Sequence, residues 1–143
     1  MSDDGKNGAL KQDQTEASPV TVLLVDDEES VRAIVVKILR RAKYSVIEAE
    51  NGDAALKAAA AHDGKIDIVV TDMYMPGMRG PELVQALSLA RPGIRALFMS
   101  GYSDQDPRTS LPEGANFLHK PFSGQSLTSA VEAVLHNYAG PSE

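Results

Sequence analysis

The sequence predicts one domain of the α/β class, a doubly wound sheet of five parallel strands with helices on both faces. Short apolar runs alternate along the chain with segments whose apolar residues recur at helical spacing. Few residues separate most of these segments, as expected where right-handed crossovers join parallel strands. Three runs are almost continuously apolar and two are mixed, so we expect the former at the centre of the sheet and the latter at its edges.

The first three elements are a strand at 20–25 (VTVLLV), a helix at 28–42 and a strand at 44–49 (YSVIEA). The first strand is apolar throughout, whereas the second alternates between apolar and polar residues, as a half-exposed strand does. The helix has one apolar face, because its apolar residues lie three or four positions apart, at Val31, Ile34, Val35, Ile38 and Leu39.

Two helices follow in the middle of the chain. An alanine-rich helix is predicted over 51–64, where Asn51 is placed to cap its start and Gly64 to end it. The next helix, at 80–90, has Pro81 in its first turn. Proline is favoured there because the first backbone N–H groups of a helix have no partner within the helix.

The remaining strands are predicted at 66–71, 94–99 and 115–119, the last one being short and polar. The final helix follows Ser123, its predicted cap. Its apolar residues share one face, at Leu127, Ala130, Val131, Val134 and Leu135.

The segment GYSDQDPRTSLPEG, at 101–114, lies between the fourth and fifth strands. Its two prolines, Pro107 and Pro112, leave no room for a regular helix of several turns. An interior proline destabilises a helix by about 3 kcal/mol. We therefore predict that the fourth helix of this fold is short or irregular.

The strand order 2-1-3-4-5 satisfies the burial patterns and defines a flavodoxin-like (βα)5 fold. Ligands of such sheets bind beyond the carboxyl ends of the strands, near the switch point between strands 1 and 3. Asp26 and Asp27 follow the first strand, with Glu28 close behind, and Asp72 follows the third. Neighbouring strands lie about 4.8 Å apart, so these carboxylates should converge.

Converging carboxylates repel one another unless a cation shares them. Oxygen ligands with places left for water suit Mg²⁺, so we predict a site for Mg²⁺ (or Mn²⁺) here. Each aspartate also has an alternative interpretation: Asp26 or Asp27 could cap the following helix, and Asp72 could bond the backbone of its own turn. Ser100 and Lys120, at the ends of strands 4 and 5, add a hydroxyl and an ammonium group at the same edge.

Four segments, LLVDDEES, VVTDMYMPGMRGPEL, LFMSGY and FLHKPF, together resemble the signature segments of receiver domains from two-component response regulators. The resemblance covers roughly residues 20–138. It implies that a sensor histidine kinase or a histidine phosphotransfer protein phosphorylates an aspartate of this chain. It also implies a phosphorylation-dependent contact with a downstream protein. By position, Asp72 resembles the phosphoacceptor and Lys120 the lysine that contacts the phosphoryl group.

The resemblance implies roles for further residues. Ser100 resembles the switch hydroxyl, and Phe117 the aromatic side chain that moves inward on activation. Pro121 matches a position where the family usually holds a cis Lys–Pro bond. The metal ligands that the resemblance implies are Asp26, Asp27, Asp72 and the backbone carbonyl of Tyr74.

The residue types agree with this chemistry. A carboxylate that attacks phosphorus is a nucleophile, and Mg²⁺ together with Lys120 would neutralise charge on the transferred group. The new phosphoryl oxygens would attract the Ser100 hydroxyl and leave space that Phe117 can fill. We hypothesise that phosphorylation changes the surface around strands 4 and 5 in this way.

Two tyrosines could control the lifetime of the aspartyl phosphate. Tyr74 lies two residues beyond Asp72, and Tyr102 lies two residues beyond Ser100. We hypothesise that both rings hinder water at the mouth of the site; the alternative is that both are partly exposed packing residues. Soft sulfur ligands do not suit an oxygen-rich site, so we interpret three nearby methionines as packing residues: Met73, Met75 and Met78.

Composition limits the compartment and the partners. The chain of 143 residues contains no cysteine, which excludes thiolate chemistry and fits the cytoplasm. A net charge of −6 disfavours nonspecific binding to nucleic acid. No apolar run is long enough to predict a membrane span or a signal peptide. We expect a disordered tail at 1–18, the receiver domain at 19–139 and a second tail at 140–143.

Two other classes of function remain open. A Mg²⁺-dependent phosphatase acting on a small substrate would need an acid or base close to Asp72, yet Met73 and Tyr74 follow it. A degenerate receiver that only binds partners would not need the complete set of acids, serine and lysine. Few residues follow the last helix, so we expect a phosphoacceptor signalling domain and not an enzyme. The chain is either a single-domain regulator, which the Met-Ser start favours, or the receiver of a hybrid kinase.

Overall fold

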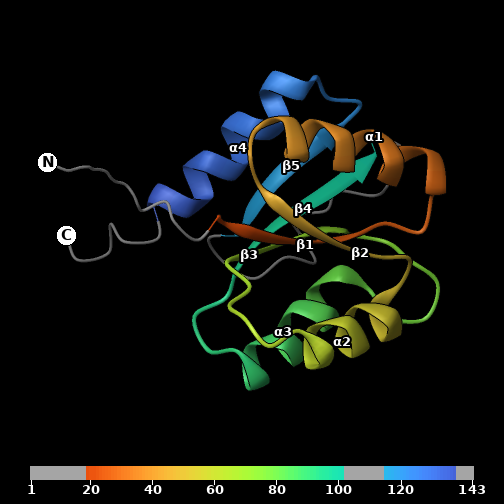
Figure 1. Cartoon of the computed structure of the whole chain (residues 1–143). Helices are drawn as coiled ribbons and strands as arrows, with labels where there is room; N and C mark the ends of the chain where they lie inside the picture. Colours follow the sequence, from red (N-terminus) through yellow and green to blue (C-terminus); the bar gives the residue numbers. More distant parts are fainter. Residues whose placement is uncertain (1–18, 102–114, 138–143) are drawn as a thin grey trace, which may run out of the picture.

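The computed structural model describes residues 19–101 and 115–137, which form a parallel sheet with helices on both faces (Figure 1). The strand order is β2-β1-β3-β4-β5, which confirms the predicted topology. The strands are β1 (Thr21–Val25), β2 (Ser45–Ala49), β3 (Ile68–Asp72), β4 (Arg95–Gly101) and β5 (Asn116–Lys120).

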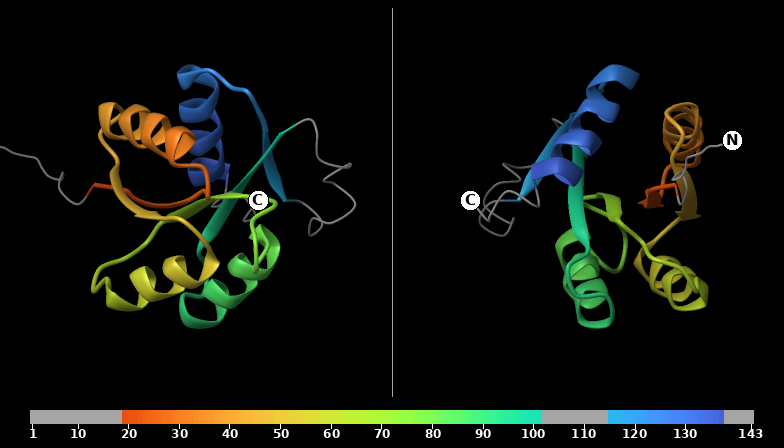
Figure 2. Two further views of the ribbon diagram at one scale, coloured as in Figure 1. Left: turned by 90° about the vertical axis from the view of Figure 1, so that its right-hand side faces the viewer. Right: turned by 60° about the vertical axis from the view of Figure 1, so that its left-hand side comes forward.

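Helices α1 (Glu29–Arg41) and α4 (Gly124–Asn137) cover one face of the sheet, and α2 (Gly52–Ala61) and α3 (Gly80–Ala90) cover the other (Figures 1 and 2). Helix α4 is the last helix of the described residues, and it follows β5. The helix predicted to be irregular between β4 and β5 lies outside the described residues, as do the predicted tails at 1–18 and 140–143.

The burial of the strands follows the predicted order. Every residue of β1 and β3 is buried, and so are most residues of β4, whereas β2 and β5 are largely part-exposed. Residues that alternate along the strands divide the core into two apolar clusters, one beneath α1 and α4 and one beneath α2 and α3. The two layers hold the sheet, and therefore the carboxyl ends of its strands, in a fixed position.

Two predicted helix caps are confirmed. The Asn51 side chain accepts a hydrogen bond from the Ala54 amide at 2.7 Å, and Ser123 Oγ accepts one from the Ser126 amide at 3.0 Å. Pro81 lies in the first turn of α3, as predicted.

The predicted end of α2 is wrong. The helix ends at Ala61, before Gly64, and extended backbone at His62 follows. Arg91, at the end of α3, bonds the carbonyl oxygens there: its Nη2 donates to Ala59 and His62 at 2.9 and 2.8 Å, and its Nη1 donates to Gly64 at 2.9 Å. An arginine from another helix thus satisfies the carbonyl groups that a terminal glycine motif would otherwise satisfy.

No helix within the described residues is long and apolar enough to span a membrane.

Candidate functional site

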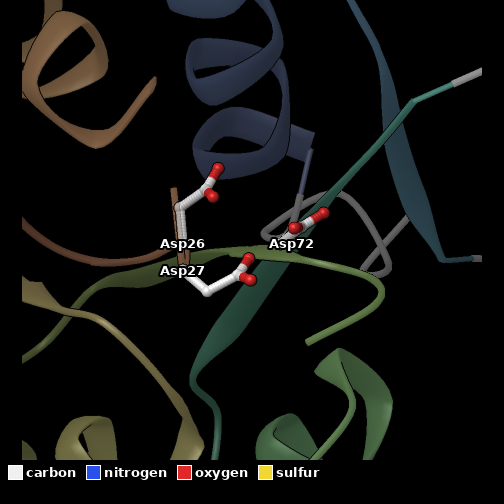
Figure 3. Close-up of side chains that lie close together, drawn as sticks. All are labelled: Asp26, Asp27 and Asp72. Atoms are coloured by element: carbon white, nitrogen blue, oxygen red, sulfur yellow. The ribbon is translucent and has the colours of Figure 1, made fainter. Parts of the chain in front are cut away.

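Three carboxylates meet at the carboxyl edge of the central strands (Figure 3). Asp26 and Asp27 follow β1, Asp72 ends β3, and one oxygen from each lies within 4.8 Å of the others. Asp26 is fully buried, Asp72 is 7% exposed and Asp27 is exposed. The predicted convergence of these side chains is therefore confirmed.

The register of the sheet explains why the carboxylates meet. Val25 pairs with Thr71 across β1 and β3, so the next residues along the chain, Asp26 and Asp72, lie side by side at the carboxyl edge of the sheet. The Met73 amide donates to the Met99 carbonyl at 2.8 Å, which extends the ordered backbone one residue beyond Asp72. The backbone of Asp72 thus belongs to β3, and its carboxylate lies at the end of a buried strand.

Each of the four polar groups of Asp26 makes a hydrogen bond. Its N–H donates to the Ala49 carbonyl at 3.2 Å, and its carbonyl accepts from Arg32 Nη1 at 2.7 Å. Its Oδ1 accepts from the Glu28 amide at 2.9 Å, and its Oδ2 accepts from Lys120 Nζ at 3.0 Å. The bond to Glu28 precedes α1 directly, so Asp26 both belongs to the carboxylate cluster and steadies the start of the helix.

Lys120 lies among the carboxylates. Its ammonium group is 3.0 Å from Asp26, 3.6 Å from Asp72 and 3.9 Å from Glu28, and its side chain is 17% exposed. Burial by itself would lower the pKa of Lys120. The hydrogen bond to Asp26 and the negative charges of Asp72, Asp26 and Glu28 outweigh burial, so the pKa lies above the ordinary lysine value.

Asp27 differs from its neighbour, because no described residue bonds or pairs with its carboxylate. The exposed Asp27 carboxylate can therefore offer both of its oxygen atoms to a cation, while both carboxylate oxygens of Asp26 already accept hydrogen bonds. Carboxylate oxygens that leave room for water fit Mg²⁺ or Mn²⁺.

The other predicted site residues lie at the same end of β4 and β5. Ser100 is fully buried, and its hydroxyl donates to the Gly101 carbonyl at 3.2 Å. Phe117 pairs with Phe98 across the two strands, and its ring meets the edge of the His119 ring at a centroid distance of 4.4 Å. The Lys120–Pro121 peptide bond is cis, as the resemblance implied.

The loop after Asp72 contains one of the two predicted gate residues. Tyr74 is partly exposed, and the Arg79 guanidinium lies 5.1 Å from the centre of its ring. Tyr102 lies outside the described residues. Met73 and Met75 are buried and Met78 packs against the core, which confirms that the three methionines are packing residues.

Gly80 allows this loop to close tightly. Its amide donates to the Met73 carbonyl at 2.9 Å. A Cβ atom at Gly80 would lie 2.5 Å from the Asp72 carbonyl oxygen, closer than atoms can approach. A side chain there would displace the backbone of Asp72, so glycine helps to fix the position of the carboxylate.

Sequence reasoning missed Arg32, which contacts the site through the Asp26 carbonyl. The signal available in the sequence was weak. Arg32 follows Asp26 by six residues and falls in the first turn of the predicted helix, but cations on helices are mostly solvated.

Comparison with known proteins gives one family. The family model of the response regulator receiver domain matches residues 22–132. The sensor kinase CckA of Brucella abortus is 42% identical over 117 residues, which cover 80% of this chain but only 12% of the kinase. The response regulator receiver protein CpdR of the same organism is 29% identical over 116 residues, which cover 80% of this chain and 95% of that protein.

A solved structure agrees with these matches. The crystal structure of the receiver domain from the hybrid histidine kinase CckA superposes with a TM-score of 0.68 at 30% identity, covering 80% of this chain and 98% of that one. The likeness therefore extends over a whole receiver domain.

Proposed function

This chain belongs to the receiver domain family of two-component response regulators, and from that premise we propose that Asp72 accepts a phosphoryl group from a histidine kinase or a histidine phosphotransfer protein. The observation that carries the proposal is the position of Asp72. Its carboxylate is nearly buried at a strand end, beside Asp26 and Asp27 and 3.6 Å from Lys120. A carboxylate at this position can act as a nucleophile toward phosphorus. The lysine beside it can offset the negative charge of the phosphoryl group, and the neighbouring acids can hold a cation that does the same.

Asp26, Asp27, Asp72 and the backbone carbonyl of Tyr74 would hold Mg²⁺ or Mn²⁺. The geometry favours Asp27 and Asp72 as direct ligands, because Asp26 already accepts two hydrogen bonds. When bound, the cation supplies positive charge that offsets the negative charge of the transferred group.

Asp72, Lys120 and Asp26 would each have a separate role in phosphoryl transfer. A carboxylate oxygen of Asp72 forms a bond to phosphorus while the bond from phosphorus to the donor nitrogen breaks and leaves its electron pair on that nitrogen. The Lys120 ammonium stabilises the phosphoryl oxygens. Asp26 holds Lys120 at 3.0 Å and so positions that charge.

Phosphorylation would then change the surface near β4 and β5. The new phosphoryl oxygens attract the Ser100 hydroxyl away from the Gly101 carbonyl, which accepts its hydrogen bond at 3.2 Å. Phe117 moves into the vacated space, and a downstream protein binds the altered surface. The chain acts as a signalling domain, with no reaction other than its own phosphorylation and dephosphorylation. The lack of cysteine fits the reducing cytoplasm, which we propose as its location.

Tyr74 would slow the loss of the phosphoryl group, and Tyr102, two residues beyond Ser100 in the sequence, is the second residue to which we assign this role. The cation–π contact with Arg79 restrains the Tyr74 ring. If the ring excludes water with an effect of about 1 kcal/mol, Tyr74→Ala should lose phosphoryl about fivefold faster. An unchanged rate would contradict this role.

The direct test of the proposed function is phosphoryl uptake by the intact chain. We expect incubation with acetyl phosphate to add the mass of one phosphoryl group when Mg²⁺ is present, and much less when a chelator removes the cation. Peptide mapping should place the group on Asp72. The proposal fails if the mass does not change at any Mg²⁺ concentration.

The phosphodonor would dock on α1. Ile34 is an exposed apolar side chain on this helix and lines a hollow of about 440 Å³ that extends to Lys120 and Phe122. Lys37 and Arg41 follow Ile34 at helical spacing and are exposed. An apolar contact flanked by two cations fits a donor protein with acidic residues around an apolar patch.

Ile34→Asp should slow phosphotransfer from the donor protein by about tenfold, as expected when an interface loses an apolar contact worth 1–2 kcal/mol. Uptake from acetyl phosphate should not change, because a small donor needs no docking face. The measurement compares both rates, using a kinase from the source genome that phosphorylates the wild-type chain.

Leu89→Asp is the matched control, since Leu89 is also an exposed apolar residue but lies on α3, across the sheet. Equal rates of protein-to-protein transfer for the two variants would show that α1 is not the docking face.

A further inference from the structure

Arg32, in the first turn of α1, links that helix to the residues around the carboxylates. Its Nη1 donates to the Asp26 carbonyl oxygen at 2.7 Å, and its Nε lies 3.6 Å from a carboxylate oxygen of Glu48 on β2. The Arg32 side chain is 16% exposed. A guanidinium group that donates a short, charge-assisted bond and also has an acidic partner is held firmly in place.

The bonded carbonyl lies where the chain leaves the sheet. The paired residues of β1 end at Val25, and the Asp26 N–H makes the last bond to β2, to the Ala49 carbonyl. The Asp26 carbonyl comes next and bonds Arg32 instead of a strand. Because a peptide group is planar, fixing this carbonyl also fixes the nitrogen of Asp27 and the direction in which that residue starts.

Asp27 depends on this restraint more than the other two acids. Bonds to Glu28 and Lys120 hold the Asp26 carboxylate. No described residue holds the carboxylate of Asp27. Within the described residues, the backbone is therefore the restraint that sets where this side chain starts relative to Asp72.

We infer that Arg32 is a positioning residue for the cation site: by holding the Asp26 carbonyl, it places the Asp27 carboxylate opposite Asp72. This inference rests on the proposed function, because it takes Asp27 and Asp72 as the ligands of Mg²⁺. Positioning and charge act in opposite directions here. A guanidinium group repels a nearby cation, so the charge of Arg32 by itself would weaken Mg²⁺ binding.

The sign of the change on removing Arg32 separates these two effects. Arg32→Met keeps an unbranched side chain but loses both the donor and the charge, and Arg32→Lys keeps one charged donor. We expect Arg32→Met to weaken Mg²⁺ binding by about tenfold, the lower end of the range for residues that orient metal ligands. Arg32→Lys should recover part of that loss.

The measurement is a titration of the full chain with MgCl2, followed by the NMR shifts of the Asp27 and Asp72 amides in isotope-labelled protein. Arg40→Met is the matched control, because it removes the same charge from an exposed position of the same helix. Its affinity for Mg²⁺ should equal that of the wild type. Thermal unfolding of each variant, by circular dichroism, separates loss of fold from loss of affinity.

Three results would overturn the role of Arg32. Tighter Mg²⁺ binding by Arg32→Met would show that charge repulsion dominates. Unchanged affinity with a lowered melting temperature would show a purely structural role. Equal losses in the Met and Lys variants would show that the donated bond is not what matters. Failure of the proposed function has a different signature: the wild-type chain itself would not bind Mg²⁺, or Asp27→Asn would bind it equally well.

Discussion

Asp72→Asn should take up no detectable phosphoryl group from acetyl phosphate in the presence of Mg²⁺. Asparagine has nearly the same size as aspartate, so the fold should survive, but its neutral amide is not a nucleophile toward phosphorus. The loss should persist when MgCl2 is raised to saturation, because extra cation cannot replace the attacking oxygen. Intact-protein mass spectrometry measures the result directly.

Asp27→Asn is the informative comparison. It keeps the acceptor but removes a carboxylate that lies within 4.8 Å of Asp72 and has no partner among the described residues. We expect Asp27→Asn to take up phosphoryl groups poorly at a low MgCl2 concentration and to recover when the concentration is raised. Asp72→Asn should not recover. If Asp72→Asn becomes phosphorylated at the wild-type rate, the acceptor is another residue, and peptide mapping would identify it.

Much of the fold follows from the apolar pattern alone. A strand covered on both faces must be apolar at nearly every position, so burial ranks the strands, and the ranking leaves β1, β3 and β4 in the centre. The convergence of Asp26 with Asp72 then requires only that neighbouring parallel strands end together. The sheet order places Lys120 and Asp26, 94 residues apart, at the same edge, but it does not predict their 3.0 Å hydrogen bond, because β3 and β4 lie between their strands.

Residues whose roles depend on another helix could not be predicted in this way. Gly64 is a reasonable helix terminator by local rules, yet Arg91 bonds the end of α2 from 27 to 32 residues away. Arg32 is similar, because only the fold shows that its guanidinium reaches the Asp26 carbonyl and not solvent. A flexible cationic side chain has many local alternatives, and packing between elements selects one of them.

Lys120→Met should destabilise the chain by about 3–5 kcal/mol in the absence of divalent cations, as expected when one partner of a buried ion pair is removed. The variant leaves the fully buried Asp26 and the nearly buried Asp72 without their shared cation. The free energy of unfolding in urea measures this loss. Because the pKa of Lys120 is raised, the stabilisation that Lys120 gives the wild type depends on pH. It is fully present below the ordinary lysine pKa and disappears only as the pH rises through the raised value.

Lys65→Met is the matched control for the same charge. Lys65 lies 3.5 Å from Asp67, but its side chain is 77% exposed, so its loss should lower stability by only about 0–1 kcal/mol. Adding MgCl2 should stabilise Lys65→Met as much as the wild type, because a cation bound only by the native carboxylates stabilises the native state. It should stabilise Lys120→Met by more, because the cation then also offsets the negative charge that Lys120 no longer balances. Equal stabilities of the two variants without Mg²⁺ would mean that Lys120 does not offset the charge of this pocket. If Mg²⁺ does not raise the free energy of unfolding of Lys120→Met, the variant has lost stability because the lysine side chain no longer packs there. The negative charges of Asp26, Asp72 and Glu28 would then not be the cause.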